Sequence, residues 1–463
     1  MRYVTLSPQY MLRGWKDRPI ALYDWNCDGL DIKKAVPLTA KQLEAIELVT
    51  APGVSIDMPL LPSALRRAAE KMLAAGVFQE CNRETGLADY QKYEYKDNRF
   101  IQLLTWSITG KCNLRCKHCY IHADDGKYGE LSFAQCEEAV RQMLEAGVYM
   151  VAFTGGEPLV RKDFWRLMDL LKANHINLME ILTNGVLITD EFLDRLEKIG
   201  RRPQIFILSF DGVNCHDWMR GIPGTERSVI EAIKRLRRWG YPVRLTTVLH
   251  AGNLESLLPT YELIKELGVS SWTVATVVNS GNWQKQKHTE LNHKRMMDEF
   301  LKLLKVYKRD GRPIAMELAG IYSGSPEDKG HIPFLGGCGT KEQEKKVLCE
   351  VSRLYPNLLP DGRLLPCIPM SGSIMEDMAP NILSADWSIA KALDESPCET
   401  YINKTYADLF ANNKECAQCE YRYQCHTCRG DALQKGDFFA KSDKACRFIK
   451  GGYAERIREL MEI

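Results

Sequence analysis

Six strand-like apolar runs alternate with amphipathic helical segments between residues 101 and about 280, and this repeat constrains the fold more than any other feature. The runs cover residues 103–108, 149–154, 178–183, 204–210, 243–249 and 271–277. The first helical segment, "SFAQCEEAVRQMLEAG", begins with a Ser132/Gln135 capping box and ends at Gly147. Strands that alternate with helices predict βαβ units and a parallel sheet. Six units predict an α/β fold with a partial (β/α)6 barrel rather than a closed eight-stranded one.

The chain has a different character on either side of this repeat. With 463 residues it is long enough for two or three domains. Residues 1–100 hold two short strand-like stretches, "QYMLRGW" and "PIALYDW", and two amphipathic helical stretches, which predict a small α+β domain. Residues 101–333 comprise the barrel and a helical connector that ends in a loop rich in glycine and proline. Residues 334–463 are rich in cysteine and in loops, as expected of a domain ordered by metal.

Charge and hydropathy exclude several classes of function. The net charge of +2 and the pI of about 7.8 provide no basic surface for nucleic acid or for a membrane. The sequence has no apolar run of roughly 18 residues, the length that a membrane span requires. The start, "MRYVTLSPQYMLRGWKDRPI", lacks the apolar stretch of a signal peptide. We therefore expect a cytoplasmic protein.

Sixteen cysteines are unusual for a protein of this kind. In the reducing cytosol, so many cysteines indicate metal binding or catalysis before disulfides. Three lie within residues 112–119, and most of the others lie between residues 338 and 446. Close-spaced thiols on short loops are not how a core is filled, so both groups are candidate metal ligands. The isolated Cys27, Cys81 and Cys136 are expected to be small buried side chains.

The first group, Cys112, Cys116 and Cys119 in "KCNLRCKHCY", directly follows the first predicted strand. A structural zinc site or a complete iron–sulfur cluster takes four protein ligands. Three thiolates can instead hold three irons of a [4Fe–4S] cluster and leave the fourth iron open to the amino and carboxylate groups of an amino-acid cofactor. The alternative is a zinc site that takes its fourth ligand from His118 or His122.

Polar or ligand-type residues also follow the next three predicted strands. They are Gly155, Gly156 and Glu157 after the second strand, Thr183 and Asn184 after the third, and Ser209 and Arg220 after the fourth. Paired glycines let the backbone approach a ligand closely, a glutamate can accept a hydrogen bond from an ammonium group, and an arginine can clamp a carboxylate. Because chemistry in such barrels gathers at the C-terminal ends of the strands, we expect one site there.

Together these motifs resemble the radical S-adenosylmethionine (SAM) superfamily over residues 101–280. The shared features are the CxxxCxxC loop followed by Tyr120, the GGEP sequence after the second strand and the six βα units. The resemblance implies that SAM is the fourth ligand of a [4Fe–4S] cluster on Cys112, Cys116 and Cys119. It also implies that reductive cleavage of SAM yields a 5′-deoxyadenosyl radical, which abstracts hydrogen from the substrate.

The same resemblance assigns roles to individual residues. The implied SAM contacts are Tyr120 near the adenine, Gly155, Gly156 and Glu157 at the methionyl ammonium group, Thr183 and Asn184 at a ribose or another cofactor edge, and Ser209 and Arg220 near the ribose and the carboxylate. The loop after the fourth strand also contains Cys215, a thiol that could quench a substrate radical by donating hydrogen.

The C-terminal cysteines form a second recognisable pattern. "CEVSRLYPNLLPDGRLLPC" covers residues 349–367 and has Gly362 five residues before its second cysteine, and "CAQCEYRYQCHTC" covers residues 416–428. The gap between the two CxxC pairs of the latter is too short for a zinc ribbon. The pattern resembles the SPASM extension of peptide-modifying radical enzymes, whose seven cysteines hold two auxiliary [4Fe–4S] clusters.

The SPASM resemblance implies two sets of ligands, which would bring the number of clusters to three. The sets are Cys349, Cys367 and Cys428 for the first auxiliary cluster, and Cys416, Cys419, Cys425 and Cys446 for the second. The chain departs from the family at one point, since two residues rather than the usual three separate Cys425 from Cys428. We expect Cys338 to complete the first auxiliary cluster; an open iron and Cys398 are the alternatives.

The N-terminal unit favours a peptide as the substrate. Radical SPASM enzymes that mature ribosomally made peptides often carry a winged-helix-like recognition element of this size, which captures a leader peptide by adding a strand to a sheet edge. We therefore expect a precursor peptide as the partner and a thioether crosslink, a carbon–carbon crosslink or an epimerisation as the outcome. The resemblance also implies an electron donor such as flavodoxin or ferredoxin.

Three alternative functions remain open. An anaerobic sulfatase maturase would generally lack the N-terminal unit, and an aspartate would be expected where this chain has Ile368. The second alternative is a radical enzyme that acts on a small molecule or a tetrapyrrole. The third, a non-catalytic iron–sulfur electron carrier, explains the cysteines but not the GGEP sequence, and SAM cleavage would distinguish it.

Overall fold

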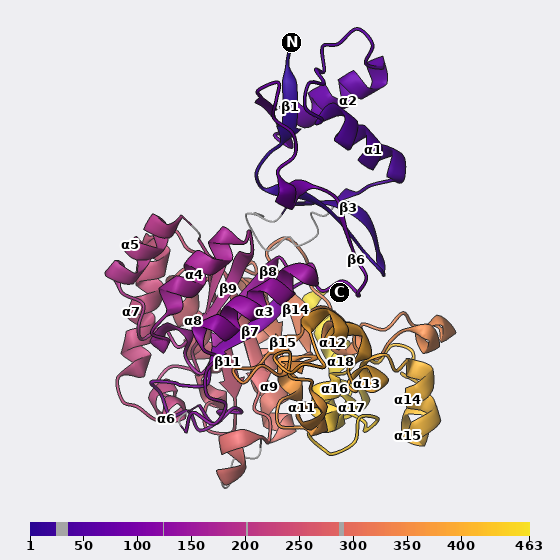
Figure 1. Cartoon of the computed structure of the whole chain (residues 1–463). Helices are drawn as coiled ribbons and strands as arrows, with labels where there is room; N and C mark the ends of the chain where they lie inside the picture. The colour runs from indigo at the N-terminus through magenta and orange to yellow at the C-terminus, as the bar shows by residue number, and fades with distance from the viewer. Residues whose placement is uncertain (25–35, 124, 201, 287–290) are drawn as a thin grey trace.

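The computed structural model describes residues 1–24, 36–123, 125–200, 202–286 and 291–463. Figure 1 shows an α/β region in the middle, an N-terminal unit mounted on one end of it, and a C-terminal region packed along its side. None of the helices in these residues combines the length and the apolar character needed to cross a bilayer. Cys27, which we expected to be a small buried side chain, lies outside the described residues.

The central sheet contains ten strands, and six of them correspond to the strands expected from the sequence. They are β7 (Leu104–Thr109), β8 (Met150–Gly155), β9 (Asn177–Thr183), β10 (Ile205–Ser209), β11 (Val243–Leu249) and β12 (Ser271–Thr276). Each of the six pairs in parallel with the next one along the chain, which confirms the predicted α/β fold.

Helices connect these strands and cover the sheet. They are α3 (Phe133–Glu145), α4 (Phe164–Ala173), α5 (Asp190–Ile199), α7 (Thr225–Arg238) and α8 (Leu257–Glu266). The capping box before α3 is present, since the Ser132 N–H donates to Gln135 Oε1 at 2.9 Å and the Gln135 N–H donates to Ser132 Oγ at 3.3 Å. These contacts satisfy two backbone groups that the first turn leaves without helical partners.

The connector after β12 differs in part from the expectation. Its helix, α9 (His293–Arg309), is as predicted, but β13 (Ala315–Leu318) and β14 (Tyr322–Gly324) follow in place of a loop. β13 pairs in parallel with β12, and β14 returns antiparallel to β13. Strands of three or four residues are too short to show a clear alternation in the sequence, and they cover an edge of the sheet that would otherwise present unpaired backbone groups.

The C-terminal region adds to the α/β core instead of only packing around metal. β15 (Asn357–Leu358) pairs in parallel with β7 and forms a hairpin with β16 (Leu364–Leu365). Its last two helices, α17 (Asp443–Lys450) and α18 (Tyr453–Met461), bury Phe448 and Ile457 in the same core as the sheet. The other helices are short: α10 (Val351–Leu354), α11 (Ile374–Met378), α12 (Ile389–Glu395), α13 (Glu399–Ile402), α14 (Tyr406–Asn412), α15 (Lys414–Ala417) and α16 (Arg429–Leu433).

The N-terminal unit has its own sheets and its own core. Its elements are β1 (Tyr3–Leu6), β2 (Tyr10–Trp15), β3 (Arg18–Asp24), β4 (Val36–Pro37), β5 (Phe78–Cys81), β6 (Glu94–Lys96), α1 (Ala40–Val49) and α2 (Ser63–Ala74). The two strands and two helices expected there are present as β2, β3, α1 and α2. β1 pairs with β5, and the other four strands form a second sheet in the order β4-β3-β2-β6.

This unit contacts the central sheet at the starts of the strands. Met11 and Trp15 pack with Leu103, Tyr149 and Met150, which lie immediately before or at the first residues of β7 and β8. The N-terminal unit therefore sits at the end of the sheet opposite to the C-terminal ends of the strands (Figure 1).

Candidate active site

A cavity of about 300 Å³ opens at the C-terminal ends of β7 to β11. It brings together ten of the residues singled out in the sequence: Cys112, Cys116, Cys119, Tyr120, Gly155, Gly156, Thr183, Asn184, Ser209 and Arg220. These residues come from four different strand ends, so the expectation that they share one site agrees with their positions. Glu157 and Cys215 are not among the residues that line it.

Each of the three thiols accepts a hydrogen bond. The Leu114 N–H donates to Cys112 Sγ at 3.3 Å, and the Ala123 N–H donates to Cys119 Sγ at the same distance. Cys116 Sγ accepts from the guanidinium of Arg220 at 3.6 Å. Because hydrogen bonds to a charged sulfur stabilise it, this set of donors suits thiolate ligands of a metal cluster.

Glycines from three separate loops press against the backbone of residues 111–120, here called the cysteine loop. A Cβ on Gly156 would lie 2.1 Å from the carbonyl oxygen of Lys111, and one on Gly221 would lie 2.5 Å from that of Arg115. A Cβ on Gly281 would lie 2.2 Å from the carbonyl oxygen of Cys119. Real Cβ atoms do not approach so closely, so any larger residue at these positions would displace the loop.

Backbone hydrogen bonds accompany these close approaches. The Glu157 N–H donates to the carbonyl of Lys111 at 2.9 Å, and the Asn282 N–H donates to the carbonyl of Cys119 at 2.9 Å. The glycines of "GGEP" thus let the second strand approach the cysteine loop itself, in addition to any ligand. Sequence reasoning missed the role of Gly221 and Gly281, because nothing local in "MRG" or "SGN" indicates which backbone lies against them.

Glu157 does not itself line the cavity but contacts residues that do. Its side chain is fully buried and accepts from Thr183 Oγ1 at 2.7 Å and from the N–H groups of Asn184 at 2.8 Å and Leu159 at 3.1 Å. Burial raises the pKa of Glu157 to about 7, although these three hydrogen bonds act in the opposite direction. The carboxylate thereby ties the end of β8 to the end of β9, beneath the residues that line the cavity.

The histidines considered for a zinc site lie in different environments. His118 lines the cavity, and burial is the main reason that its pKa falls to about 4. His122 instead places Nδ1 2.9 Å from the side-chain oxygen of Asn282. Within the part of the chain that is described, no three His, Cys, Asp or Glu side chains converge on a point where one ion would bind.

Cys215 is not among the residues that line the cavity. It precedes the short helix α6 (His216–Arg220), and its sulfur contacts the carbonyl oxygen of Gly252 at 3.7 Å. Burial raises the pKa of its thiol. For Cys215 to donate hydrogen to a substrate radical, a path from the cavity past α6 would be required.

Members of each predicted set of C-terminal cysteines lie near one another. Those assigned to the second auxiliary cluster surround a cavity of about 50 Å³: Cys416, Cys419, Cys425 and Cys446. In the first set, burial raises the pKa of Cys367 well above its ordinary value, and the nearby thiols of Cys349 and Cys428 raise it further. Ile368, next to Cys367, lines the cavity of the cysteine loop, so this set adjoins that site.

The two candidates for the remaining ligand differ in exposure. Cys338 is exposed, and its sulfur lies 3.6 Å from both the carbonyl and the hydroxyl oxygen of Thr340. Cys398 is buried and its sulfur contacts the carbonyl oxygen of Met375 at 3.5 Å. Cys338 therefore lies at the surface, whereas Cys398 is part of a packed core.

The site thus combines a mostly parallel α/β sheet with three thiols that line one cavity at the C-terminal ends of its strands. A family model described as the radical SAM superfamily matches residues 106–264. This range begins within β7 and contains the cysteine loop, the GGEP sequence and α6. Residues 106–264 are thus a radical SAM domain, and SAM is the cofactor of enzymes of that superfamily.

Curated relatives with several functions are similar to this chain. The AdoMet-dependent heme synthase of Methanosarcina barkeri (strain Fusaro / DSM 804) is 26% identical over 377 residues, which cover 76% of this chain and 97% of the relative. The PqqA peptide cyclase of Gluconobacter oxydans (strain 621H) is 25% identical and covers 77% of this chain and 92% of its own. The mycofactocin maturase MftC of Mycobacterium tuberculosis is 34% identical, over 33% of this chain and 39% of its own.

Two solved structures share the fold. Streptococcus suis SuiB bound to SAM has a TM-score of 0.60 and 15% identity, and the match covers 96% of this chain and 99% of SuiB. The protein anSMEcpe with bound AdoMet has a TM-score of 0.58 and 20% identity, and the match covers 78% of this chain and 98% of anSMEcpe. The match to SuiB thus extends over nearly the whole chain.

Proposed function

We propose that this protein uses SAM to abstract hydrogen from a residue of a ribosomally made precursor peptide, which leads to a crosslink or an epimerisation. The observation that carries the proposal is the fold likeness to SuiB over 96% of the chain, which includes most of the N-terminal unit. SuiB has also been solved bound to its precursor peptide SuiA. PqqA peptide cyclase and mycofactocin maturase, two of the curated relatives, support a peptide substrate.

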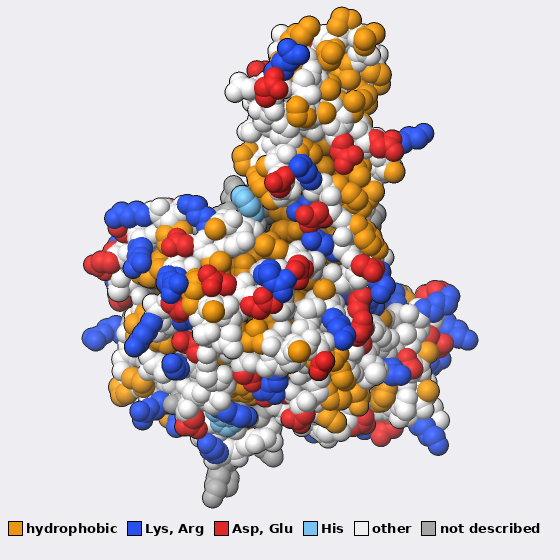
Figure 2. All heavy atoms as spheres, in the orientation of Figure 1, with side chains coloured by type: hydrophobic (Ala, Val, Ile, Leu, Met, Phe, Trp, Pro, Cys, Tyr) orange, Lys and Arg blue, Asp and Glu red, His pale blue; other side chains and the backbone are white. Residues whose placement is uncertain are grey.

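The surface of the N-terminal unit supports a role in binding. Five of the ten large hydrophobic side chains that the described residues expose lie in it: Met1, Val36, Leu48, Leu60 and Tyr95. Figure 2 shows hydrophobic side chains gathered over this unit, while charged side chains of both signs are interspersed over the α/β region. Exposed apolar groups that are concentrated in one small unit favour an interaction surface.

The distance between this unit and the cavity favours a long substrate. The unit contacts the starts of the strands, whereas the cavity lies at their ends. β9 has seven residues, so the two sites are separated by roughly 23 Å at about 3.3 Å per residue. A peptide held by the N-terminal unit must therefore pass around the barrel, which requires at least about seven extended residues.

The residues of the cavity fit a cluster and its cofactor. Cys112, Cys116 and Cys119 would hold three irons, while Thr183, Asn184 and Ser209 supply polar groups to the cavity. When bound, the cluster and SAM would supply a one-electron reductant and a 5′-deoxyadenosyl radical. The strand ends and Ile368 enclose this space, which limits the access of water to a reactive species.

The C-terminal cysteines support two auxiliary clusters, three clusters in total, and an external electron donor such as flavodoxin or ferredoxin. The second set lies around a cavity that Lys441 and Lys450 also line. Because acidic redox proteins associate with basic surfaces, this set is where we expect electrons to enter. We expect the protein to act in the cytoplasm, where the thiols stay reduced.

The experiment that tests the proposal is co-expression of the enzyme with short peptides encoded beside its gene, followed by mass spectrometry. A crosslink should remove one pair of hydrogen atoms from the peptide, and an epimerisation carried out in deuterated water should add one deuterium. Replacement of Cys112, Cys116 and Cys119 by alanine should abolish both changes as well as SAM cleavage. Release of 5′-deoxyadenosine with no change in any peptide would contradict the peptide assignment.

The N-terminal unit is tested separately with point variants. Deleting residues 1–97 would expose the barrel residues that pack against Trp15, so a truncated chain does not separate binding from folding. Leu60→Ser, at a position that is 92% exposed, should raise the KM for the precursor several-fold and leave kcat unchanged. Val351→Ser, at an exposed position in the C-terminal region, is the matched control and should leave both constants unchanged.

A second candidate function is the oxidation of a tetrapyrrole. It is supported by the match to the AdoMet-dependent heme synthase, which covers 97% of that relative. The match leaves 24% of the present chain without a counterpart in that relative. Oxidation of a tetrapyrrole by both wild type and the Leu60→Ser variant at equal rates, with no modified peptide, would favour this candidate.

A further inference from the structure

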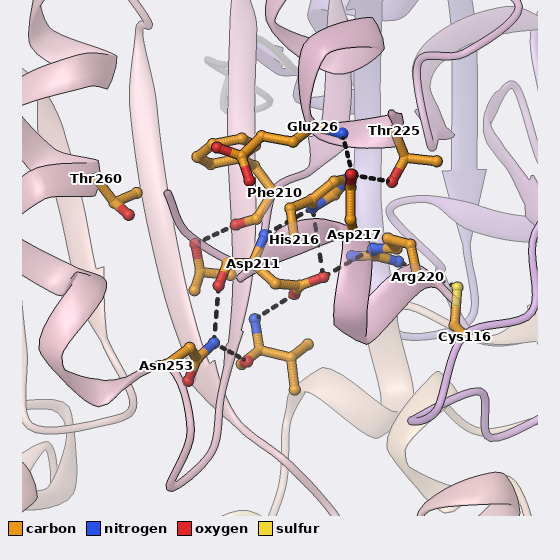
Figure 3. A network of polar contacts seen from close by, with 12 residues as sticks. Cys116, Phe210, Asp211, His216, Asp217, Arg220, Thr225, Glu226, Asn253 and Thr260 are labelled. Atoms are coloured by element: carbon orange, nitrogen blue, oxygen red, sulfur yellow. Dashed lines mark hydrogen bonds and ion pairs between the residues drawn. The ribbon is translucent and has the colours of Figure 1, made fainter. Parts of the chain in front are cut away.

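A buried ion pair lies directly beneath the cysteine loop (Figure 3). Asp211 is the second residue after the end of β10 and is fully buried, and Arg220 ends α6 and is 6% exposed. Arg220 Nε lies 2.7 Å from Asp211 Oδ2. Two opposite charges removed from water must be held in a fixed geometry, since an unpaired buried charge is strongly destabilising.

Asp211 is itself fixed by its neighbours. Its Oδ1 accepts from the Val248 N–H at 3.1 Å, and its own N–H donates to His216 Nδ1 at 3.0 Å. Asn253 Nδ2 donates to the Asp211 carbonyl at 2.8 Å and to the Val248 carbonyl at 3.0 Å. Burial alone would raise the pKa of Asp211, but Arg220, the nearby His118 and His216 and the Val248 N–H together hold the pKa below its usual value. The pair therefore stays ionised.

The other end of Arg220 reaches the cysteine loop. Its Nη1 donates to Cys116 Sγ at 3.6 Å. The backbone of α6 binds both sides of the same cysteine, because the Arg115 N–H donates to the Arg220 carbonyl at 3.1 Å and the Lys117 N–H donates to the Met219 carbonyl at 2.9 Å. An arginine has five N–H donors in a rigid fork, so one edge can bind a carboxylate while another faces a sulfur.

We propose that Arg220 is a positioning residue which, oriented by Asp211, donates to the sulfur of Cys116 and raises the reduction potential of the cluster held by the cysteine loop. The inference rests on the proposed cluster at Cys112, Cys116 and Cys119. Reduction adds a negative charge to the cluster and its thiolates, and a nearby cation stabilises that charge more in the reduced state than in the oxidised state. Arg220 thus eases electron transfer into the cluster before SAM binds, a role separate from the carboxylate contact that the resemblance implies.

The test is a redox titration of the reconstituted enzyme without SAM, followed by electron paramagnetic resonance. Subtraction of the spectrum of a Cys112→Ala/Cys116→Ala/Cys119→Ala variant isolates the signal of this cluster. In Arg220→Gln, the ratio of reduced to oxidised cluster at the cysteine loop should be about tenfold lower at any given potential. This ratio corresponds to a reduction potential that is lower by about 59 mV for one electron.

A matched control is present in the same domain. Arg161 is also buried, pairs with Asp163 through Nε at 2.7 Å and donates to Cys136 Sγ at 3.4 Å, but Cys136 is not a candidate ligand. Arg161→Gln should therefore lower thermal stability and leave the potential unchanged. An equal shift in this variant would show that loss of packing, and not the donor to Cys116, changes the potential, and it would overturn the proposal.

The same titration has further outcomes that would contradict the proposal. An unchanged potential in Arg220→Gln with intact iron would overturn the inference, even if the affinity for SAM falls. If the cluster does not assemble in Arg220→Gln, the second variant to measure is Arg220→Lys. Lysine keeps the positive charge but lacks the rigid set of guanidinium donors, so the reduction potential of the cluster should lie below that of wild type. A triple-cysteine variant with the same spectrum as wild type would contradict the proposed cluster itself, and so the proposed function.

Discussion

The cysteine loop and the C-terminal cysteines hold their thiols in different ways. The backbone of the loop lies against Gly156, Gly221 and Gly281, and it is hydrogen-bonded to segments that follow β8, β10 and β12. Five of the C-terminal cysteines, Cys416, Cys419, Cys425, Cys428 and Cys446, lie on or between α15, α16 and α17, helices of only four to eight residues. Helices this short are not stable in isolation, so their order depends on packing and on bound metal.

This difference teaches that one chain can combine a preformed ligand set with a metal-dependent one. A loop clamped by strand ends keeps its geometry with or without iron. A region of short helices gains much of its folding free energy when the ligands bind metal. We expect the two regions to respond differently whenever iron or a backbone contact is removed.

The largest effect is expected when iron is removed. Anaerobic chelation should leave the sheet and the cysteine loop protected from hydrogen exchange, because backbone contacts hold them. Residues 399–433 should lose protection, since structural metal supplies about 10 kcal/mol or more in small domains and each 1.4 kcal/mol is a factor of ten. Exchange measured by mass spectrometry should accelerate there at least about a thousandfold. Equal acceleration of hydrogen exchange in the cysteine loop and in residues 399–433 would show that both regions depend on metal to the same extent.

A smaller effect is expected from Gly221→Ala. Gly221 has a φ of 72°, which costs a larger residue about 1–2 kcal/mol, and the clash with the Arg115 carbonyl adds about 1–3 kcal/mol. Both thermal stability and the iron of the first cluster, about a third of the total, should fall.

Gly224→Ala is the control for this variant. Gly224 has a φ of 84°, so it carries the same conformational cost, but nothing lies within 4 Å of its added Cβ. It should lower the thermal midpoint slightly and retain all iron. Loss of iron in both variants would show that backbone strain, not contact with the cysteine loop, is responsible.

The pH dependence of stability should identify the contribution of Glu157. Its pKa in the folded protein is about 7 and its ordinary value is 4.5, so the folded state binds the proton more tightly. The shift contributes on the order of 3 kcal/mol to the free energy of unfolding. This contribution is fully present below pH 4.5 and is lost as the pH rises through 7. The difference in thermal midpoint between wild type and Glu157→Gln, measured on the holoenzyme without SAM, should change across this window. A constant difference would contradict the assignment.

The smallest effect is expected from Cys338→Ala. If Cys338 completes the first auxiliary cluster, this variant should alter the Mössbauer spectrum of that cluster with little loss of iron, because three ligands remain. Cys398→Ala should leave the spectrum unchanged and lower stability only as expected for a small cavity in a core. Spectra of Cys338→Ala that match those of wild type would favour an iron without a fourth protein ligand.

Much of the α/β region could be predicted because its signals are local. Alternation of apolar runs with capped helices identified β7 to β12, and the spacing of Cys112, Cys116 and Cys119 placed a candidate metal site after β7. The same reasoning could not find β13 or β15. These strands are short, and β15 reaches its partner across about 250 residues of chain, as its pairing with β7 shows.

At the candidate site, too, the sequence predicted some features and could not predict others. Residue types and spacing were enough to select ten residues that line one cavity. They were not enough to show that Glu157 is turned toward Thr183 and Asn184, or that Asp211 orients Arg220. Such contacts depend on rotamers and on neighbours that are distant in sequence.

The sequence by itself determined the class of fold, the cysteine groups and the strand ends at which chemistry gathers, because periodicity and spacing are properties of neighbouring residues. Only the tertiary structure decided which backbone lies against Gly156, Gly221 and Gly281, and which charge lies beneath Cys116. These arrangements join residues up to about 160 positions apart, such as Cys119 and Gly281. Burial and close packing, which act between distant segments, set those contacts, and no local pattern records them.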